Sequence, residues 1–203
     1  MKGYNSVSDD FDWFDHFSEE LHLSSRSIEE AEEMYEEELK RNIRGDDLIL
    51  LTVAVYIKSR QNKETRSMRQ FANVISTTIF NKRRDTTAKK MQRIYNKIRD
   101  KLDIDMRTPQ PKEQIPYISR KLDIDSETEK EIITTCEKIT KMQELTGRSC
   151  ACISGSATYI KTDFSSEEVS KVTVTGKASI ENVVQLLKEN GGEELIDESK
   201  VAV

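Results

Sequence analysis

The sequence predicts an all-α protein made of two similar halves. Only seven glycines and three prolines occur in 203 residues, which favours long helices over a β-fold. Apolar residues recur at helical spacing along most of the chain. The tripeptide Tyr-Ile-Lys also ends an apolar run twice, at 56–58 and again at 159–161. This repetition predicts an internal duplication, in which each apolar run forms the central helix of its own bundle.

The first three helices of the first half follow from caps and periodicity. The first is expected to begin at Phe11, where aromatic residues and Leu21 recur at spacings of three and four. The second is expected to begin at Ser27, with Glu30 three residues later completing a capping box. The third, at 48–57, is apolar on nearly all sides, so we expect other helices to surround it.

The fourth and fifth helices are predicted at 68–75 and 86–102, with an irregular segment between them. The fifth is amphipathic. Its apolar stripe consists of Met91, Ile94, Tyr95, Ile98 and Leu102. Lysines and arginines crowd the remaining surface of this helix, so that surface is expected to be strongly basic.

The second half repeats the order of the first. Its expected elements are a short helix at 115–122, a helix capped by Ser126 and Glu129, an apolar helix introduced by 147–149, a short helix capped by Ser165 and Glu168, and a last helix at 178–187. The apolar helix again stands third, which is the position of 48–57 in the first half.

The organisation of the chain follows from these two halves and from the prolines. Two of the three prolines lie within 103–112, which makes this segment the natural linker. The predicted boundaries are a disordered N-terminus at 1–9, a first repeat at 10–104, a linker at 105–112, a second repeat at 113–190 and a mobile acidic tail at 191–203.

The net charge of −5 conceals a strong asymmetry. Residues 1–47 carry 5 basic and 15 acidic side chains (net −10), residues 48–101 carry 14 and 3 (net +11), and residues 102–203 carry 13 and 19 (net −6). A basic block between two acidic ones predicts a surface for a polyanion or an acidic protein. The alternative is that the block only balances its acidic neighbours within the fold.

The sequence does not indicate catalytic, metal or membrane chemistry. Three cysteines make neither a disulfide framework nor a four-cysteine zinc site, and His16 and His22 lack the spacing of metal ligands. No glycine-rich phosphate loop occurs, and no apolar run reaches the roughly 18 residues of a membrane span. The N-terminus has no apolar core typical of a secretion signal. We therefore expect a non-enzyme inside the cell, without cofactor, metal, membrane or small-molecule substrate.

Five short motifs occur in order along the two halves. They are Ala54-Val55-Tyr56-Ile57 followed by Ser59-Arg60-Gln61, Thr65-Arg66-Ser67, the segment 111–122, Leu145-Thr146-Gly147-Arg148-Ser149, and the segment 179–184. Over most of the chain, from residue 10 to residue 190, they resemble the core of archaeal transcription factor B and eukaryotic transcription initiation factor IIB. The resemblance implies two tandem five-helix cyclin-like domains.

In that family the core binds the complex of TATA-binding protein and promoter DNA and works with the RNA polymerase machinery, so the resemblance implies these partners. It also implies a transcription initiation factor of archaeal type, located in the cytoplasm at the nucleoid if the source is archaeal. The expected contact residues on the basic first repeat are Arg66, Arg69, Lys89, Lys90, Arg93 and Lys97. Lysines and arginines there would neutralise phosphates, with a steep salt dependence.

The second repeat departs from the family where DNA would be read. Ser179 and Asn182 occupy the expected helix-turn-helix, but Glu181 stands where an arginine would contact DNA. We therefore regard this helix-turn-helix as degenerate. The zinc ribbon and the segment that reaches the polymerase cleft are also not found in the sequence. The leading expectation is a protein that binds TATA-binding protein or promoter DNA through its first repeat and modulates initiation.

Two alternatives stay open. Cyclin-like pairs also serve as protein-docking modules, and the basic block would then face an acidic partner without DNA binding. The resemblance could also be architectural only, because a fold does not determine a function. Binding to naked DNA, to TATA-binding protein alone and to their complex would separate these hypotheses.

Overall fold

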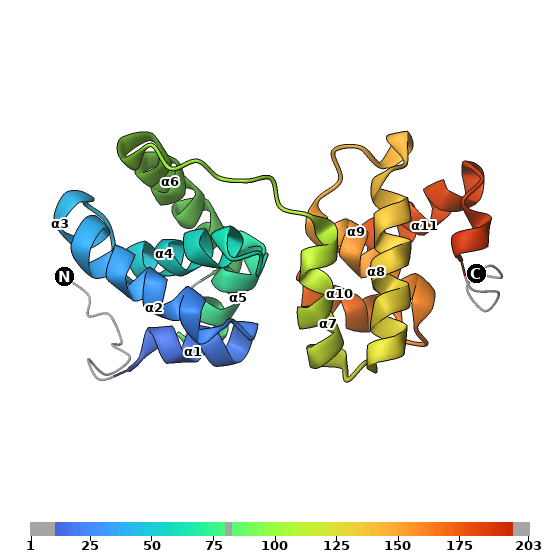
Figure 1. Ribbon diagram of the computed structural model, residues 1–203, viewed down its shortest axis with the longest axis horizontal. Helices are drawn as coiled ribbons and strands as arrows, with labels where there is room; N and C mark the ends of the chain where they lie inside the picture. Colours follow the sequence, from blue (N-terminus) through green and yellow to red (C-terminus); the bar gives the residue numbers. More distant parts are fainter. Residues whose placement is uncertain (1–10, 80–82, 197–203) are drawn as a thin grey trace. The chain divides into compact units, whose positions relative to one another are not determined.

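The computed structural model describes residues 11–79 and 83–196, and the regular structure in these residues is entirely helical, with no strand (Figure 1). The all-α prediction is therefore confirmed. The chain divides into two compact units, unit 1 (Met1–Arg107) and unit 2 (Thr108–Val203). The division lies within the segment 105–112 that we expected to be the linker.

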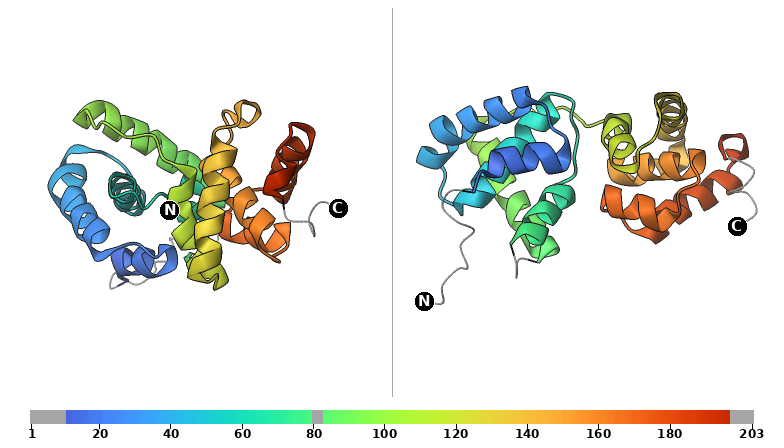
Figure 2. Two further views of the ribbon diagram at one scale, coloured as in Figure 1. Left: turned by 45° about the vertical axis from the view of Figure 1, so that its right-hand side comes forward. Right: turned by 90° about the horizontal axis from the view of Figure 1, so that it is seen from below.

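Unit 1 is built around a central helix. Its elements are α1 (Trp13–Leu21), α2 (Ser25–Glu33), the π-helical segment η1 (Met34–Leu39), α3 (Lys40–Asn42), α4 (Asp47–Gln61), α5 (Met68–Thr78) and α6 (Arg84–Leu102). Helix α4 packs against α1, α2, α5 and α6, and the left view of Figure 2 shows it nearly end-on between α2 and α6. Its Val53, Ala54 and Ile57 are fully buried, as expected for a helix that is apolar on nearly all sides.

Unit 2 is also built around a central helix. Its elements are η2 (Pro111–Gln114), α7 (Ile115–Leu122), α8 (Ser126–Thr140), η3 (Gln143–Leu145), α9 (Cys150–Lys161), α10 (Ser166–Thr173), α11 (Lys177–Glu189) and η4 (Glu193–Leu195). Helix α9 packs against α7, α8, α10 and α11. The buried hydroxyls of Ser154, Ser156 and Thr158 donate to carbonyls four residues earlier, so α9 buries them without leaving a donor unpaired.

Two helices begin at other residues than the cap patterns predict. The second helix is capped by Ser24, whose Oγ accepts the backbone N–H of Ser27. Ser27 itself is fully buried and donates to Glu64 at 2.5 Å. Helix α8 is capped by Asp125, one residue before the predicted Ser126. Sequences rich in serine and aspartate offer several possible caps, and at Ser27 the contact with the distant Glu64 accompanies the choice of Ser24.

The segments that we expected to be irregular are partly ordered. Helix α5 extends to Thr78, and α6 already begins at Arg84. In contrast to the expected mobile tail at 191–203, Leu195 and Ile196 are buried in the core of unit 2. Residues 197–203 of that tail, and the N-terminus at 1–9 expected to be disordered, lie outside the described residues.

The connection between the units is tied to each of them. In unit 1, Arg60 Nη2 donates to the carbonyl of Arg107 at 2.8 Å, and Arg107 Nε donates to the carbonyl of Arg60 at 2.9 Å. In unit 2, Cys150 Sγ donates to the carbonyl of Pro109 at 3.5 Å. Thr108 is the one residue between these two ties.

Replacement of Gly155 by leucine should destabilise unit 2, because a Cβ at this position of α9 would already lie 3.3 Å from side-chain atoms of Ile180 and Thr173. We expect Gly155→Leu to lower the free energy of unfolding by about 1–3 kcal/mol, the usual range for overpacking. Urea unfolding followed by far-UV circular dichroism measures the change. The matched control is Ala178→Leu, at an exposed position of α11, which should have little effect. Equal effects of the two variants would contradict the tight packing of α9.

Candidate polyanion interface

Helix α6 carries most of the predicted contact residues. Its Met91, Tyr95 and Ile98 are buried in the core of unit 1 and form the stripe that the sequence predicts. Because this stripe occupies one side of the helix, the opposite side faces solvent. Half of the basic residues of the block 48–101, seven of the fourteen, therefore lie on the exposed surface of α6.

Four exposed residues line up along this surface. Lys89, Gln92, Arg93 and Asn96 occur at positions i, i+3, i+4 and i+7, which is the spacing of one helix face. The side-chain Nε2 of Gln92 donates to Oδ1 of Asn96 at 2.9 Å. We define the α6 face as Lys89, Lys90, Gln92, Arg93, Asn96 and Lys97, all of which are exposed. The search for charged residues in the sequence missed Gln92 and Asn96 as members of this face, because both are neutral. Their spacing of three and seven residues from Lys89 is the sequence feature that places them there.

The positive charge in the middle of α6 is not neutralised by carboxylates. No acidic residue occurs from 86 to 99. Within the described part of the chain, Lys89, Lys90 and Arg93 take part in no ion pair. The alternative in which the basic block only balances its acidic neighbours is therefore not supported at these three positions.

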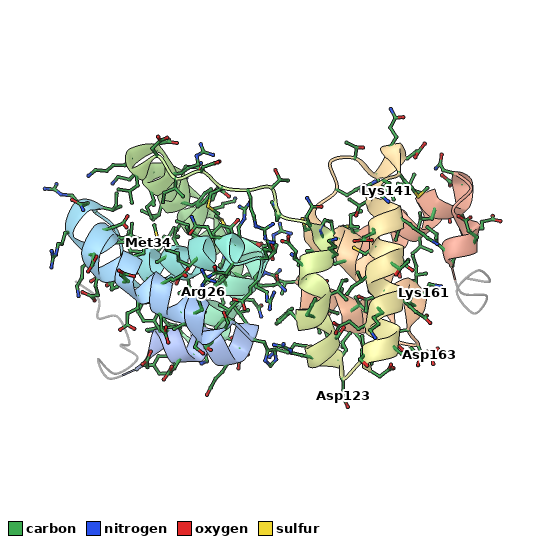
Figure 3. The ribbon with its side chains drawn as sticks, viewed as in Figure 1. Arg26, Met34, Asp123, Lys141, Lys161 and Asp163 are labelled. Carbon is green, nitrogen blue, oxygen red and sulfur yellow. The ribbon has the colours of Figure 1, made fainter. Side chains whose placement is uncertain are left out.

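The acidic first block is paired in part with its own basic residues. On α2, Nε of Arg26, the residue labelled in Figure 3, lies 2.8 Å from Oε1 of Glu30. This hydrogen bond is the main reason that the pKa of Glu30 is lowered. Further along the same helical segment, Lys40 Nζ lies 2.9 Å from Oε1 of Glu36. These pairs have the i, i+4 spacing of exposed helix pairs, which stabilise a helix only weakly.

The C-terminal half of α6 also donates hydrogen bonds to the segment 42–44, which precedes α4. Lys97 Nζ donates to the carbonyl of Arg44 at 3.3 Å, and Lys101 Nζ donates to the carbonyl of Asn42 at 2.7 Å. Asn42 is the last residue of α3, where helix carbonyls carry partial negative charge and lysine is favourable. Lys97 is exposed, as predicted for a contact residue, but it has this structural contact as well.

Arg66 is not part of the exposed surface. It is only 4% exposed, and its guanidinium donates to the carbonyls of Leu21, Thr65 and His22 at 3.0, 3.0 and 3.4 Å. These bonds join the end of α1 to the residues before α5. Arg66 therefore has a structural role, in place of the surface contact that the family motif implied. Arg69, in the first turn of α5, is exposed.

The predicted second-repeat site maps to α10 and α11, which are joined by a short turn. Asn182 is exposed, whereas Ser179 is half-buried and its carbonyl accepts a hydrogen bond from Cys152 Sγ. Glu181 accepts from the hydroxyl of Ser166 at 2.8 Å and lies 3.5 Å from Nζ of Lys177. The acidic residue is thus fixed on the surface where a DNA contact would be expected.

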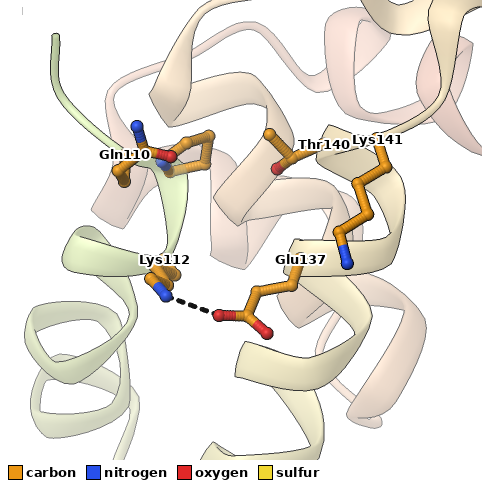
Figure 4. Close-up of a pocket in the computed structure, with 6 residues that line it drawn as sticks. Gln110, Lys112, Glu137, Thr140 and Lys141 are labelled. Carbon is orange, nitrogen blue, oxygen red and sulfur yellow. Dashed lines mark hydrogen bonds and ion pairs between the residues drawn. The ribbon is translucent and has the colours of Figure 1, made fainter.

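A pocket of about 320 Å³ lies in unit 2 between η2 and α8 (Figure 4). Its lining residues are Gln110, Pro111, Lys112, Glu137, Thr140 and Lys141. Lys112 Nζ pairs with Glu137 at 2.5 Å, and this hydrogen bond, followed by the charges of Lys112 and Lys141, lowers the pKa of Glu137. The same pair raises the pKa of Lys112. Lys112 and Glu137 thus stabilise each other's charged forms.

Other site types find little support in the described residues. Among them, no group of three histidine, cysteine, aspartate or glutamate side chains is placed to hold a metal ion. None of the described helices combines the length and the apolar character of a membrane span. Burial raises the pKa of the Cys136 thiol to about 12, so at neutral pH this cysteine is not a thiolate nucleophile.

The role of Arg66 predicts a loss of stability on substitution. Arg66→Met keeps most of the side-chain volume but leaves three carbonyls without their donor, so we expect the free energy of unfolding to fall by about 2–4 kcal/mol. Trp13, the single tryptophan, lies in α1. Its fluorescence reports the unfolding of unit 1 in urea. The exposed Arg69→Met is the control and should change stability by less than about 0.5 kcal/mol. Similar losses in both variants would contradict the structural role of Arg66.

The pair in the pocket predicts a measurable titration shift. In Lys112→Met, Glu137 loses its hydrogen-bond donor and its nearest positive charge, so its pKa should rise towards the ordinary value of a glutamate, about 4.3. Carbon-13 NMR of the glutamate carboxyls as a function of pH measures this change. Lys130→Met, on the same helix and outside the pocket, should leave the pKa of Glu137 in place. An unchanged pKa in Lys112→Met would show that the pair does not persist in solution.

Comparison with known proteins adds no family assignment. No model of a known protein family matches the chain, and no curated protein matches it. The likeness to the transcription factor B core therefore rests on short motifs and on the order of the helices.

Proposed function

We propose that this chain is a divergent transcription initiation factor B-like protein that binds promoter DNA, TATA-binding protein or their complex through unit 1. The observation that carries the proposal is the positive charge of Lys89, Lys90 and Arg93 on an exposed helix surface, where no carboxylate of residues 11–79 or 83–196 pairs with them. Phosphates would supply the missing negative charge, and the release of their counterions would favour binding. An acidic surface of TATA-binding protein would be attracted by the same residues.

The order of helices supports two tandem five-helix cyclin-like domains as the underlying fold. If α2, η1 and α3 are taken as one segment, each unit has five main helical segments within the described residues. The third of them, α4 or α9, is the central buried one in each case. Tyr-Ile-Lys also occurs in the last two turns of both central helices, at 56–58 and at 159–161. These correspondences are those of an internal duplication.

Binding is centred on unit 1 in this proposal. Helices α10 and α11 of unit 2 carry Glu167, Glu168 and Glu181 on the surface where the family places its helix-turn-helix. Glutamates repel phosphates, so unit 2 is poorly suited to reading an upstream promoter element. A protein that occupies the promoter complex through unit 1 without this upstream readout would modulate initiation.

Charge reversal of the α6 face tests the proposal. In gel-shift titrations on a TATA-containing duplex, with and without TATA-binding protein, we expect Lys89→Glu/Arg93→Glu to lose about tenfold or more in affinity at low salt. The neutral variant Lys89→Gln/Arg93→Gln should lower the slope of log K against log salt by about two, because each phosphate contact contributes roughly 0.9.

The control is Lys130→Glu/Lys138→Glu, which makes the same charge change at exposed positions of α8 and should bind like the wild type. Equal losses in this control would show that net charge, and not the α6 face, determines binding. No shift with naked DNA, with TATA-binding protein or with their complex, at micromolar protein and low salt, would contradict the proposal. That result would favour a cyclin-like protein-docking module.

A further inference from the structure

We infer that α6 is a recognition helix that enters the major groove of duplex DNA and reads base edges with Gln92, Arg93 and Asn96. In this arrangement Lys89 and Lys90 contact phosphates at the sides of the groove. The inference rests on the proposed function and specifies how the α6 face would use DNA. It places sequence recognition in unit 1, on a different helix pair from α10 and α11.

The position of α6 in unit 1 suits a recognition helix. Helices α5 and α6 are consecutive and pack against each other, and the second of them has one side in the core and the other in solvent. Helix-turn-helix proteins join two packed helices by a turn of about three or four residues and place the second helix in the major groove. Here five residues, 79–83, separate α5 from α6. The acid-free stretch 86–99 extends about 20 Å along the axis at 1.5 Å per residue. This length is sufficient for the groove of B-DNA, which is roughly 12 Å wide.

The residue types on the α6 face are those that distinguish bases. Asparagine and glutamine form paired hydrogen bonds with adenine, and arginine forms them with guanine. Lysine and arginine alone would be enough for phosphates, because neutral amides release no counterions. The presence of Gln92 and Asn96 between basic residues therefore indicates more than backbone binding.

The amides of Gln92 and Asn96 are held by each other before any ligand binds. Because Gln92 Nε2 donates to Asn96 Oδ1 at 2.9 Å, each side chain has part of its freedom removed in the free protein. This hydrogen bond does not use the side-chain carbonyl oxygen of Gln92 or the side-chain NH2 group of Asn96. The first provides an acceptor and the second a donor for a base edge. Such a pair meets the pattern that adenine presents in the major groove.

Other partners make less use of these residues. An acidic protein surface would need the lysines but not the two amides. The major groove of duplex RNA is deep and too narrow for side chains to read. Unit 2 has a similar pair, in which Gln185 Nε2 donates to Glu189 at 2.8 Å, but there the second residue is acidic. Gln185 therefore provides a matched control for the role of Gln92.

The decisive variant is Gln92→Ala/Asn96→Ala, which keeps the charge of α6 and introduces a residue with high helix propensity. The full-length wild type is first used to select binding sequences from a pool of random duplexes. Dissociation constants are then measured for the selected duplex and for a scrambled one. We expect the wild type to prefer the selected duplex and the variant to lose about tenfold or more of that preference. Its affinity for the scrambled duplex and its salt slope should stay within about twofold of the wild type.

Gln185→Ala should leave both affinities unchanged. A wild type that binds duplexes with a steep salt dependence but enriches no sequence would overturn the inference and leave the proposed function intact. Equal loss of affinity for both duplexes in Gln92→Ala/Asn96→Ala, or equal wild-type affinity for duplex RNA of the selected sequence, would also overturn it. Absence of any binding to duplex DNA, with or without TATA-binding protein, would overturn the inference together with the DNA-binding part of the proposed function.

Discussion

The burial of one central helix in each unit is the constraint on which the rest of the structure depends. Helices α4 and α9 have no side suited to water, so the other helices of the unit must enclose them. Each enclosing helix contributes an apolar stripe and leaves its remaining surface free. In α6 this stripe is narrow, with Met91 and Ile98 fully buried. The basic surface of α6 is thus a direct result of the way in which the core of unit 1 is closed.

Local patterns predict the helices well and their exact ends less well. The central helix expected at 48–57 and the capping box of Ser165 and Glu168 are both present, because each depends on residues close together in the chain. The cap expected at Ser27 is absent, since the hydroxyl of that serine donates a hydrogen bond to Glu64, 37 residues away. Leu195 gave no periodic signal after two glycines, and only the three-dimensional packing shows that it belongs to the core.

The candidate site was predictable where it depends on charge and periodicity. Lys89 and Arg93 are exposed because they lie opposite an apolar stripe that is visible in the sequence. Arg66 has the same charge and lies in the same basic block, yet it is buried. No sequence pattern shows that the carbonyls of Leu21 and His22, more than 40 residues earlier, converge on its guanidinium. Charge therefore identifies the block, whereas the fold decides which of its members can meet a ligand.

The short connection between the units affects how weak contacts would add up. With Arg107 tied to Arg60 and Pro109 tied to Cys150, a single residue separates the fixed ends of the two units. A tether this short gives each unit an effective concentration near the other of about millimolar order. Once unit 1 is bound to a long polymer or to a large complex, unit 2 would engage the same target in an intramolecular step. Contacts of unit 2 that are too weak to detect in isolation could then contribute to the avidity and the residence time of the whole chain.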